Sequence, residues 1–236
     1  MFNLKKTHRT TLKINNLTKK FGSYTAVKDF SLEISEPGLY LFVGDNGSGK
    51  TTLFNIICGL IAQNKGYIEL NNFKDADLRR KQMGISTEPF ITEPSLSVLE
   101  IAEIARKIKQ TSFEEIKKLL LLWEIWPAQE KAFKALSTGM KKRLSLALSM
   151  LGNPNYLLWD EPFNGLDPLG IKLLNQVIQE LIEKRKTIFL STHLLNEINF
   201  QATACFIMKE GILTSTVLRN STDNFNETII NILKNE

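Results

Sequence analysis

Hydrophobic and polar residues alternate along the chain in two patterns, which predict different elements. Apolar residues at every second position are typical of half-buried strands, and apolar residues three or four apart are typical of helices. Because short apolar strands alternate with helices, we expect an α/β fold with a mixed, mostly parallel sheet flanked by helices. The predicted strands are residues 11–17, 26–34, 39–43, 66–70, 156–160 and 187–191, and a hairpin of 205–208 and 212–217. The predicted helices are residues 50–61 and 194–202 and the stretch that Asp167 and Pro168 begin.

The middle of the chain differs, because residues 90–150 show only helical spacing. Ser97 and Ser112 are each followed three residues later by glutamate, the spacing of a capping box at a helix start. We therefore expect an all-helical subdomain at about residues 90–150, inserted into a single domain of residues 1–236. Residues 219–236 are expected to be a polar tail.

Composition excludes several classes of protein. Apolar residues make up 43% of the 236 and charged residues 23%, which is typical of a globular chain. Two cysteines cannot form a disulfide framework and indicate a reducing compartment. No apolar run is long enough to span a membrane, and polar residues 1–10 do not resemble a secretory signal. The net charge of +5 permits an anionic partner, or reflects only a lysine-rich solvated surface.

A glycine-rich segment directly after the strand 39–43 is the strongest chemical signal. It reads Gly-Asp-Asn-Gly-Ser-Gly-Lys-Thr and matches the Walker A pattern. Glycines let backbone N–H groups surround a polyphosphate, and the helix that follows points its positive end at the same anion. Lys50 is expected to reach the β and γ phosphates, and the Thr51 hydroxyl to ligate Mg²⁺. The residues expected to bind the nucleotide here are Gly44, Asp45, Asn46, Gly47, Ser48, Gly49, Lys50, Thr51 and Thr52.

A pair of carboxylates ends the strand 156–160. An apolar strand that ends in aspartate is the Walker B arrangement, and Asp160 could hold Mg²⁺ directly or through water. Glu161 could orient or deprotonate a water in line with the γ-phosphate. Taken alone, the pair would more often be a helix cap or part of a solvated loop. After a Walker A motif, the catalytic interpretation is favoured.

The motifs resemble, in their order, those of the nucleotide-binding subunit of ABC transporters, over about residues 11–218. The resemblance implies a P-loop NTPase core with an antiparallel β subdomain and a helical signature subdomain. It also implies that Phe21 stacks on adenine. His193 matches the switch histidine, which contacts the γ-phosphate and the attacking water, so that Lys50, Glu161 and His193 form the expected catalytic set.

Residues 136–140, Leu-Ser-Thr-Gly-Met, resemble the signature motif of this family, with departures at Thr138 and Met140. In the family, the signature contacts the ATP that the other subunit binds. Gly-Leu-Asp at 165–167 matches the D-loop, which lines the interface between the subunits. The resemblance therefore assigns four further nucleotide contacts, Ser137, Thr138, Gly139 and Asp167.

The lid loop departs from the family pattern. Glu88 stands where the family has a glutamine that contacts Mg²⁺. Glutamate can also ligate Mg²⁺, but it adds a negative charge near the γ-phosphate. The expected metal ligands are therefore Thr51, Asp160 and Glu88.

The resemblance implies an ATPase that uses ATP and Mg²⁺ to power transport through a separate membrane-spanning subunit. We expect it at the cytoplasmic face of the cell membrane, with export as the direction of transport. A second ATP-binding subunit, identical or not, would complete a head-to-tail dimer, and no specific nucleic acid is expected. Two alternatives remain at this stage. One is a soluble ABC ATPase that acts on nucleic acid, the ribosome or an assembly machinery, and the other is a binding module that does not hydrolyse ATP.

Overall fold

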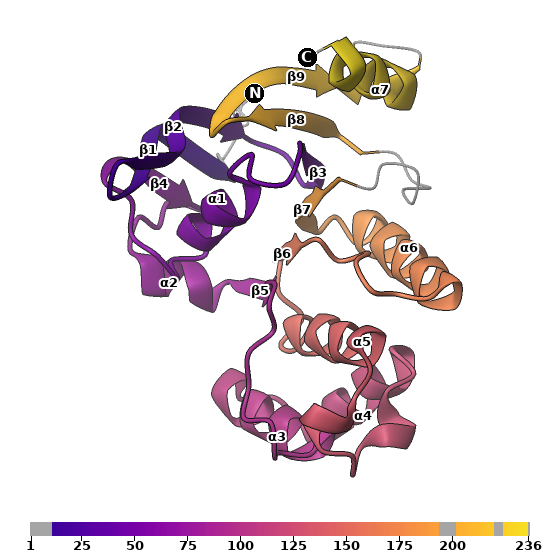
Figure 1. Cartoon of the computed structure of the whole chain (residues 1–236). Helices are drawn as coiled ribbons and strands as arrows, with labels where there is room; N and C mark the ends of the chain where they lie inside the picture. The colour runs from indigo at the N-terminus through magenta and orange to yellow at the C-terminus, as the bar shows by residue number, and fades with distance from the viewer. Residues whose placement is uncertain (1–10, 194–201, 220–223, 236) are drawn as a thin grey trace, which may run out of the picture.

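The computed structural model describes residues 11–193, 202–219 and 224–235. The helix predicted over 194–202 falls on residues that, apart from Ala202, lie outside this range. The described residues form two β-sheets flanked by helices (Figure 1), which confirms the predicted fold class. No helix in the described ranges is long and apolar enough to cross a membrane.

The smaller sheet is antiparallel and has the strand order β2-β1-β4. Its strands are β1 (Leu12–Phe21), β2 (Tyr24–Ile34) and β4 (Lys65–Leu70). Gly22, with φ of 59°, lies in the turn that joins β1 to β2. This turn brings the exposed ring of Phe21 to the end of the sheet. Strand β1 extends closer to the turn than the alternating pattern predicts.

The larger sheet has six strands in the order β5-β6-β7-β3-β8-β9. All neighbouring pairs are parallel except the β8–β9 hairpin, which the sequence predicts. The carboxyl ends of β3, β6 and β7 therefore meet at one edge, where α/β proteins commonly bind ligands. The strands are β3 (Gly38–Val43), β5 (Met83–Ser86), β6 (Tyr156–Asp160), β7 (Thr187–Thr192), β8 (Ala204–Lys209) and β9 (Ile212–Leu218).

Helices cover the larger sheet and extend to one side of it. They are α1 (Lys50–Ile57), α2 (Ala76–Lys81), α3 (Val98–Lys109), α4 (Phe113–Leu122), α5 (Thr138–Ser149), α6 (Pro168–Glu183) and α7 (Phe225–Asn235), with single 3₁₀ turns at Trp126–Ala128 and Phe133–Ala135. Figure 1 shows α3, α4 and α5 together at one end of the molecule, and α7 beside β9 at the other. The tail that the sequence presents as polar thus contains a helix, whose Phe225 and Ile229 are buried.

The central strand β3 separates two hydrophobic cores. Leu39, Leu41 and Val43 face a core that includes α6, α7 and the helical segment α3–α5. Tyr40 and Phe42 face a second core, formed with α1 and the smaller sheet. This alternation is the two-residue period of a strand whose two faces are both buried.

Helix ends agree only partly with the sequence signals. Ser97 and Glu100 form the predicted reciprocal capping box at the start of α3. Ser112 caps α4, but the Glu115 carboxylate accepts the Gly152 N–H at 2.7 Å instead of closing the box, so the second prediction was half wrong. Helix α1 ends at Ile57, before the predicted residue 61, because Gly59 takes the left-handed conformation that ends helices.

Candidate functional site

The glycine-rich loop connects β3 to α1 and passes close to β2 and β8. A side-chain carbon at Gly44 would lie 2.1 Å from the Met208 carbonyl oxygen, and one at Gly49 would lie 2.4 Å from that of Ala26. Both positions therefore require glycine. Gly49 has no side chain that could cap α1, so the first N–H groups of this helix remain available to an anion.

Lys50 is the first residue of α1, and its ammonium group turns back onto the loop. The side chain is buried, and Nζ donates to the carbonyl oxygens of Gly44 at 2.7 Å and Asp45 at 3.1 Å. Burial lowers the pKa of Lys50, and the negative charge of Glu161, whose Oε1 is 3.8 Å from Nζ, opposes that shift. The loop thus holds a buried cation whose hydrogen bonds can be transferred to phosphate oxygens.

Asp160 ends β6 and is fully buried. Ser191, its neighbour on β7, donates its hydroxyl to Oδ1 of Asp160 and accepts the N–H of Glu161 at 2.9 Å. The other carboxylate oxygen, Oδ2, is buried and has no hydrogen-bond partner within the described ranges. Burial raises the pKa of Asp160, and the Ser191 hydrogen bond acts in the opposite direction. The site therefore contains a buried carboxylate oxygen without a hydrogen-bond partner among the described residues.

Glu161 connects the loop lysine to the predicted switch histidine. Its backbone has φ of 47°, the left-handed conformation that is uncommon outside glycine and is often found at functional sites. Besides its approach to Lys50, the carboxylate places Oε2 3.0 Å from Nδ1 of His193. The structure therefore brings together Lys50, Asp160, Glu161 and His193, as the sequence predicts.

A cavity of about 300 Å³ opens beside the loop. It is lined by residues 43–48, by His193, by residues 207–210 around the β8–β9 turn and by Leu233 of α7. Backbone N–H groups of such a glycine-rich loop favour a phosphate chain as the ligand of this cavity.

The residues beside the loop also fit a magnesium ion. In phosphoryl-transfer sites Mg²⁺ takes one or two carboxylates, a hydroxyl and oxygens of the substrate phosphates. Asp160 offers its buried, unpartnered oxygen, and Thr51 lies close enough to lower the pKa of that carboxyl. No group of three or more His, Cys, Asp or Glu side chains in the described ranges could hold a metal.

Two aromatic residues stand at the β1–β2 turn beside the loop. The Tyr24 hydroxyl donates to the Gly47 carbonyl oxygen at 3.4 Å. The Phe21 ring is 50% exposed, and the Lys19 ammonium lies 4.8 Å from its centre. A large exposed ring next to a phosphate loop suits stacking on a base.

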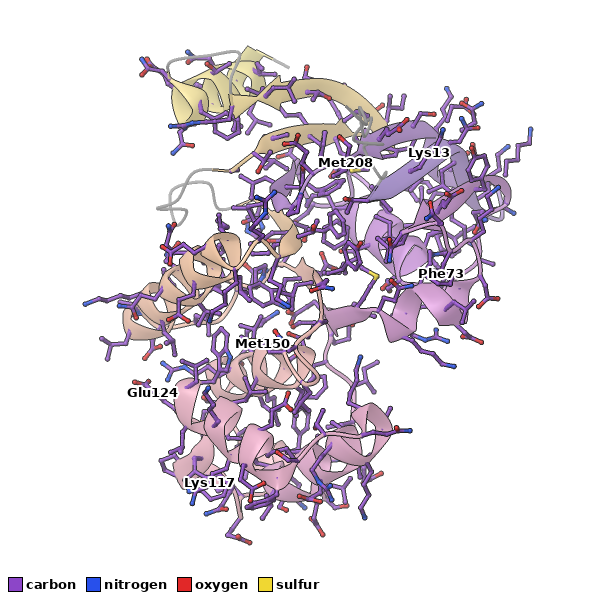
Figure 2. The ribbon with its side chains drawn as sticks, turned by 180° about the vertical axis from the view of Figure 1, so that it is seen from behind. Lys13, Phe73, Lys117, Glu124, Met150 and Met208 are labelled. Carbon is purple, nitrogen blue, oxygen red and sulfur yellow. The ribbon has the colours of Figure 1, made fainter. Side chains whose placement is uncertain are left out.

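We expect Phe21→Ala to weaken ATP binding by about 5- to 150-fold, because stacking of a base on an aromatic side chain contributes about 1–3 kcal/mol. Equilibrium binding of ATP and of inorganic triphosphate would measure this effect. Triphosphate binding should not change, because it involves no base. Phe73→Ala, at another exposed ring (Figure 2), is the control. Equal losses for ATP and triphosphate would contradict stacking.

The predicted signature lies at the start of α5. Ser137 caps this helix by accepting the Met140 N–H at 3.2 Å. Gly139 lies against the Gly165 loop, where a side-chain carbon would be 2.8 Å from the Gly165 carbonyl oxygen. The described residues that line the cavity include none of Ser137, Thr138, Gly139 and Asp167. The chain therefore does not by itself bring its signature to that cavity.

Arg143 joins the signature helix to the D-loop. Asp167 caps α6, as predicted, by accepting the Gly170 N–H at 2.9 Å. The Arg143 guanidinium donates to Asp167 at 2.7 Å and to Glu124 at 2.5 Å, and it lowers the pKa of Asp167. Figure 2 shows Glu124 on the side of the helical segment nearest α6. One arginine thus connects the helical segment to the start of α6.

Glu88, the expected third metal ligand, follows β5 and forms an ion pair with Lys142 of α5. Sequence reasoning missed this lysine and also missed Ser191. A hydroxyl two residues before the switch histidine was a weak signal for Ser191. Nothing local in the sequence pointed to Lys142.

The loop, the buried lysine and the carboxylates at the end of β6 define the class of protein, which is a P-loop nucleotide hydrolase. The ABC transporter family model matches residues 27–164. The lantibiotic transport ATP-binding protein SrtF of Streptococcus pyogenes is 32% identical, over 85% of this chain and 87% of its own length. The bacitracin transport ATP-binding protein BcrA of Bacillus licheniformis is 34% identical, over 88% of this chain and 70% of its own length.

Solved structures of ABC transporter cassettes are also similar to this chain. The dimeric structure of MJ0796, a bacterial ABC transporter cassette, has a TM-score of 0.78 at 27% identity and covers 88% of this chain and 98% of that one. An ATP-binding subunit of an ABC transporter has a TM-score of 0.81 at 25% identity, over 90% of this chain and 91% of its own. The chain belongs to the ABC transporter family, and it is an ATPase.

Proposed function

We propose that this ATPase powers transport, in the direction of export, through a separate membrane-spanning subunit at the cytoplasmic face of the cell membrane. The observation that carries the proposal is the similarity, over 85–88% of the chain, to proteins named for lantibiotic and bacitracin transport. The site supports it, because Oε2 of Glu161 and Nδ1 of His193, the two groups that hydrolysis would use, lie 3.0 Å apart.

Binding of ATP begins with the exchange of hydrogen bonds at Lys50. The ammonium that now donates to Gly44 and Asp45 would turn to the phosphate oxygens, and the uncapped start of α1 would add its N–H groups. Phe21 would stack on the base. Mg²⁺, when bound, would neutralise phosphate charge, with Thr51 and Asp160 as its protein ligands.

Hydrolysis would use the Glu161 carboxylate to orient and deprotonate the attacking water. Ser191 fixes the Glu161 backbone, and His193 holds one carboxylate oxygen. The histidine would also donate to the γ-phosphate as charge develops there. Lys50 would hold the transferred group during the reaction.

A second ATP-binding subunit would complete each site. The signature residues Ser137, Thr138 and Gly139 stand at the amino end of α5, a position suited to phosphate. We propose that they contact ATP held by the other subunit, with Asp167 at the interface. The MJ0796 cassette, which is similar in fold, forms a dimer.

Affinity purification from detergent-solubilised membranes of the source organism tests the transport proposal. A tagged Glu161→Gln chain with ATP should retain a polytopic membrane protein, and adding this protein should change the ATPase rate of the unmodified chain. The tagged chain without ATP is the control. Recovery with ribosomes or nucleic acid, or with no membrane protein, would overturn the proposal.

A further inference from the structure

A lysine lies over the exposed aromatic ring at the end of β1. The Lys19 ammonium is 4.8 Å from the centre of the Phe21 ring, within the roughly 6 Å at which the face of an aromatic ring attracts a cation. The lysine covers one face of the ring. Because the ring is still half exposed, a planar ligand can stack on the face that the lysine leaves open.

The same ammonium is anchored to the segment that follows α1. Nζ of Lys19 donates to the Ala62 carbonyl oxygen at 2.7 Å. Asn64 joins this segment to β1 through two further hydrogen bonds. Its N–H donates to the Thr18 carbonyl oxygen at 2.9 Å, and its side-chain oxygen accepts the Lys20 N–H at 2.7 Å. The lysine is therefore held between the ring and the backbone beyond the helix that starts at the glycine-rich loop.

The other strand of the turn is bonded to the glycine-rich loop itself. Phe21 and Tyr24 are directly opposite in the register of β1 and β2, so their side chains leave the same face of the sheet. The Tyr24 hydroxyl donates to the Gly47 carbonyl oxygen at 3.4 Å. The turn is thus bonded to the loop before α1 through Tyr24 and to the segment after α1 through Lys19. These contacts set the position of the ring relative to the start of α1.

We propose that Lys19 is a positioning residue for the nucleotide base, and that it holds the Phe21 ring in place for stacking before ATP binds. An ordered ring favours binding because a side chain that is already fixed loses no further rotational freedom when the ligand arrives. The inference rests on the proposed stacking of Phe21 on adenine and adds the residue that prepares the ring. Lys19 itself contacts neither the base nor the phosphates.

Removal of the Lys19 ammonium tests the proposal. Lys19→Met keeps an unbranched side chain and is expected to weaken binding of adenosine β,γ-methylene triphosphate by about two- to ten-fold, the range for ordering one side chain on binding. Inorganic triphosphate should bind Lys19→Met as it binds the unmodified chain, because it has no base. Lys19→Arg retains a cation and a donor, and should bind the analogue within about two-fold of the unmodified chain. Isothermal titration calorimetry with the full chain would measure these dissociation constants.

A second lysine in the same part of the chain gives a matched control. The Lys74 ammonium lies 4.6 Å from the centre of the Tyr67 ring on β4. Lys74→Met removes the same charge from another aromatic ring of the smaller sheet and should leave both affinities unchanged. The double variant of Phe21→Ala and Lys19→Met should bind the analogue no more weakly than Phe21→Ala alone, because no ring remains to be held.

The outcomes separate the role of Lys19 from the stacking on which it rests. A loss confined to the analogue, and absent once Phe21 is alanine, supports the proposal. An equal loss for triphosphate would overturn it, and so would a further loss in the double variant, because Lys19 would then act without the ring. If Phe21→Ala weakens binding of the analogue and Lys19→Met does not, the role of Lys19 fails and stacking stands. If Phe21→Ala has no effect, stacking fails, and the role of Lys19 fails with it.

Discussion

Replacement of Glu161 by glutamine is expected to lower ATP turnover by about 10²- to 10⁴-fold, the usual contribution of a positioned general base. Glutamine has nearly the same shape and can still contact His193, but it cannot accept a proton from water. ATP should remain bound, because the loop and Lys50 are unchanged. The variant is therefore expected to separate binding from hydrolysis.

Phosphate release at saturating ATP and equilibrium binding of ATP would check this prediction. Glu183→Gln removes an exposed carboxylate at the end of α6 and serves as the control, with turnover within about two-fold of the unmodified chain. Turnover of Glu161→Gln close to that of the control would show that another group activates the water.

Replacement of Lys50 by alanine is expected to weaken ATP binding by about 30-fold or more and to abolish hydrolysis. Truncating one member of a buried, hydrogen-bonded charge pair costs about 2–5 kcal/mol. Here the truncated member is Lys50, and the phosphate chain is left without its cation. The loop also loses the ammonium that bonds the carbonyl oxygens of Gly44 and Asp45. The substitution therefore removes positive charge from the anion site and also weakens the hydrogen bonds that shape the loop.

Titration with a fluorescent ATP analogue would measure the loss of ATP affinity in Lys50→Ala. Lys28→Ala, on the exposed side of β2, is the control. Circular dichroism would verify that the variant is folded. Unchanged ATP affinity in a folded Lys50→Ala variant would show that the loop is not part of the nucleotide site.

The order of strands and helices could be predicted from the sequence wherever burial produces a periodic or continuous pattern of apolar residues. β3 and β6 are continuous apolar runs because both of their faces are covered. Strand β5 was missed because it has only four residues. One of these is Gly84, where a side-chain carbon would lie 1.8 Å from the Ser149 carbonyl oxygen. Helix α2 was missed because its buried residue, Arg79, bonds backbone carbonyl oxygens and adds no apolar stripe.

The residues of the candidate site also fall into two groups, those that the sequence predicts and those that it does not. The loop with Lys50, and the pair Asp160 and Glu161, are local motifs, so their residues were found from spacing alone. Ser191 and Lys142 act on partners 31 and 54 residues away. Those contacts exist only after β7 and α5 have packed beside β6 and β5, so the local sequence gives at most a weak signal for Ser191 and none for Lys142.

Arg143 connects the helical segment α3–α5 to the start of α6. Its guanidinium belongs to the helical segment, yet it bonds Asp167, six residues beyond Glu161. A swing of α3, α4 and α5 relative to the larger sheet must break that bond or drag the first turn of α6 along. The arginine is thus a tether that couples any rigid-body motion of the helical segment to the start of α6.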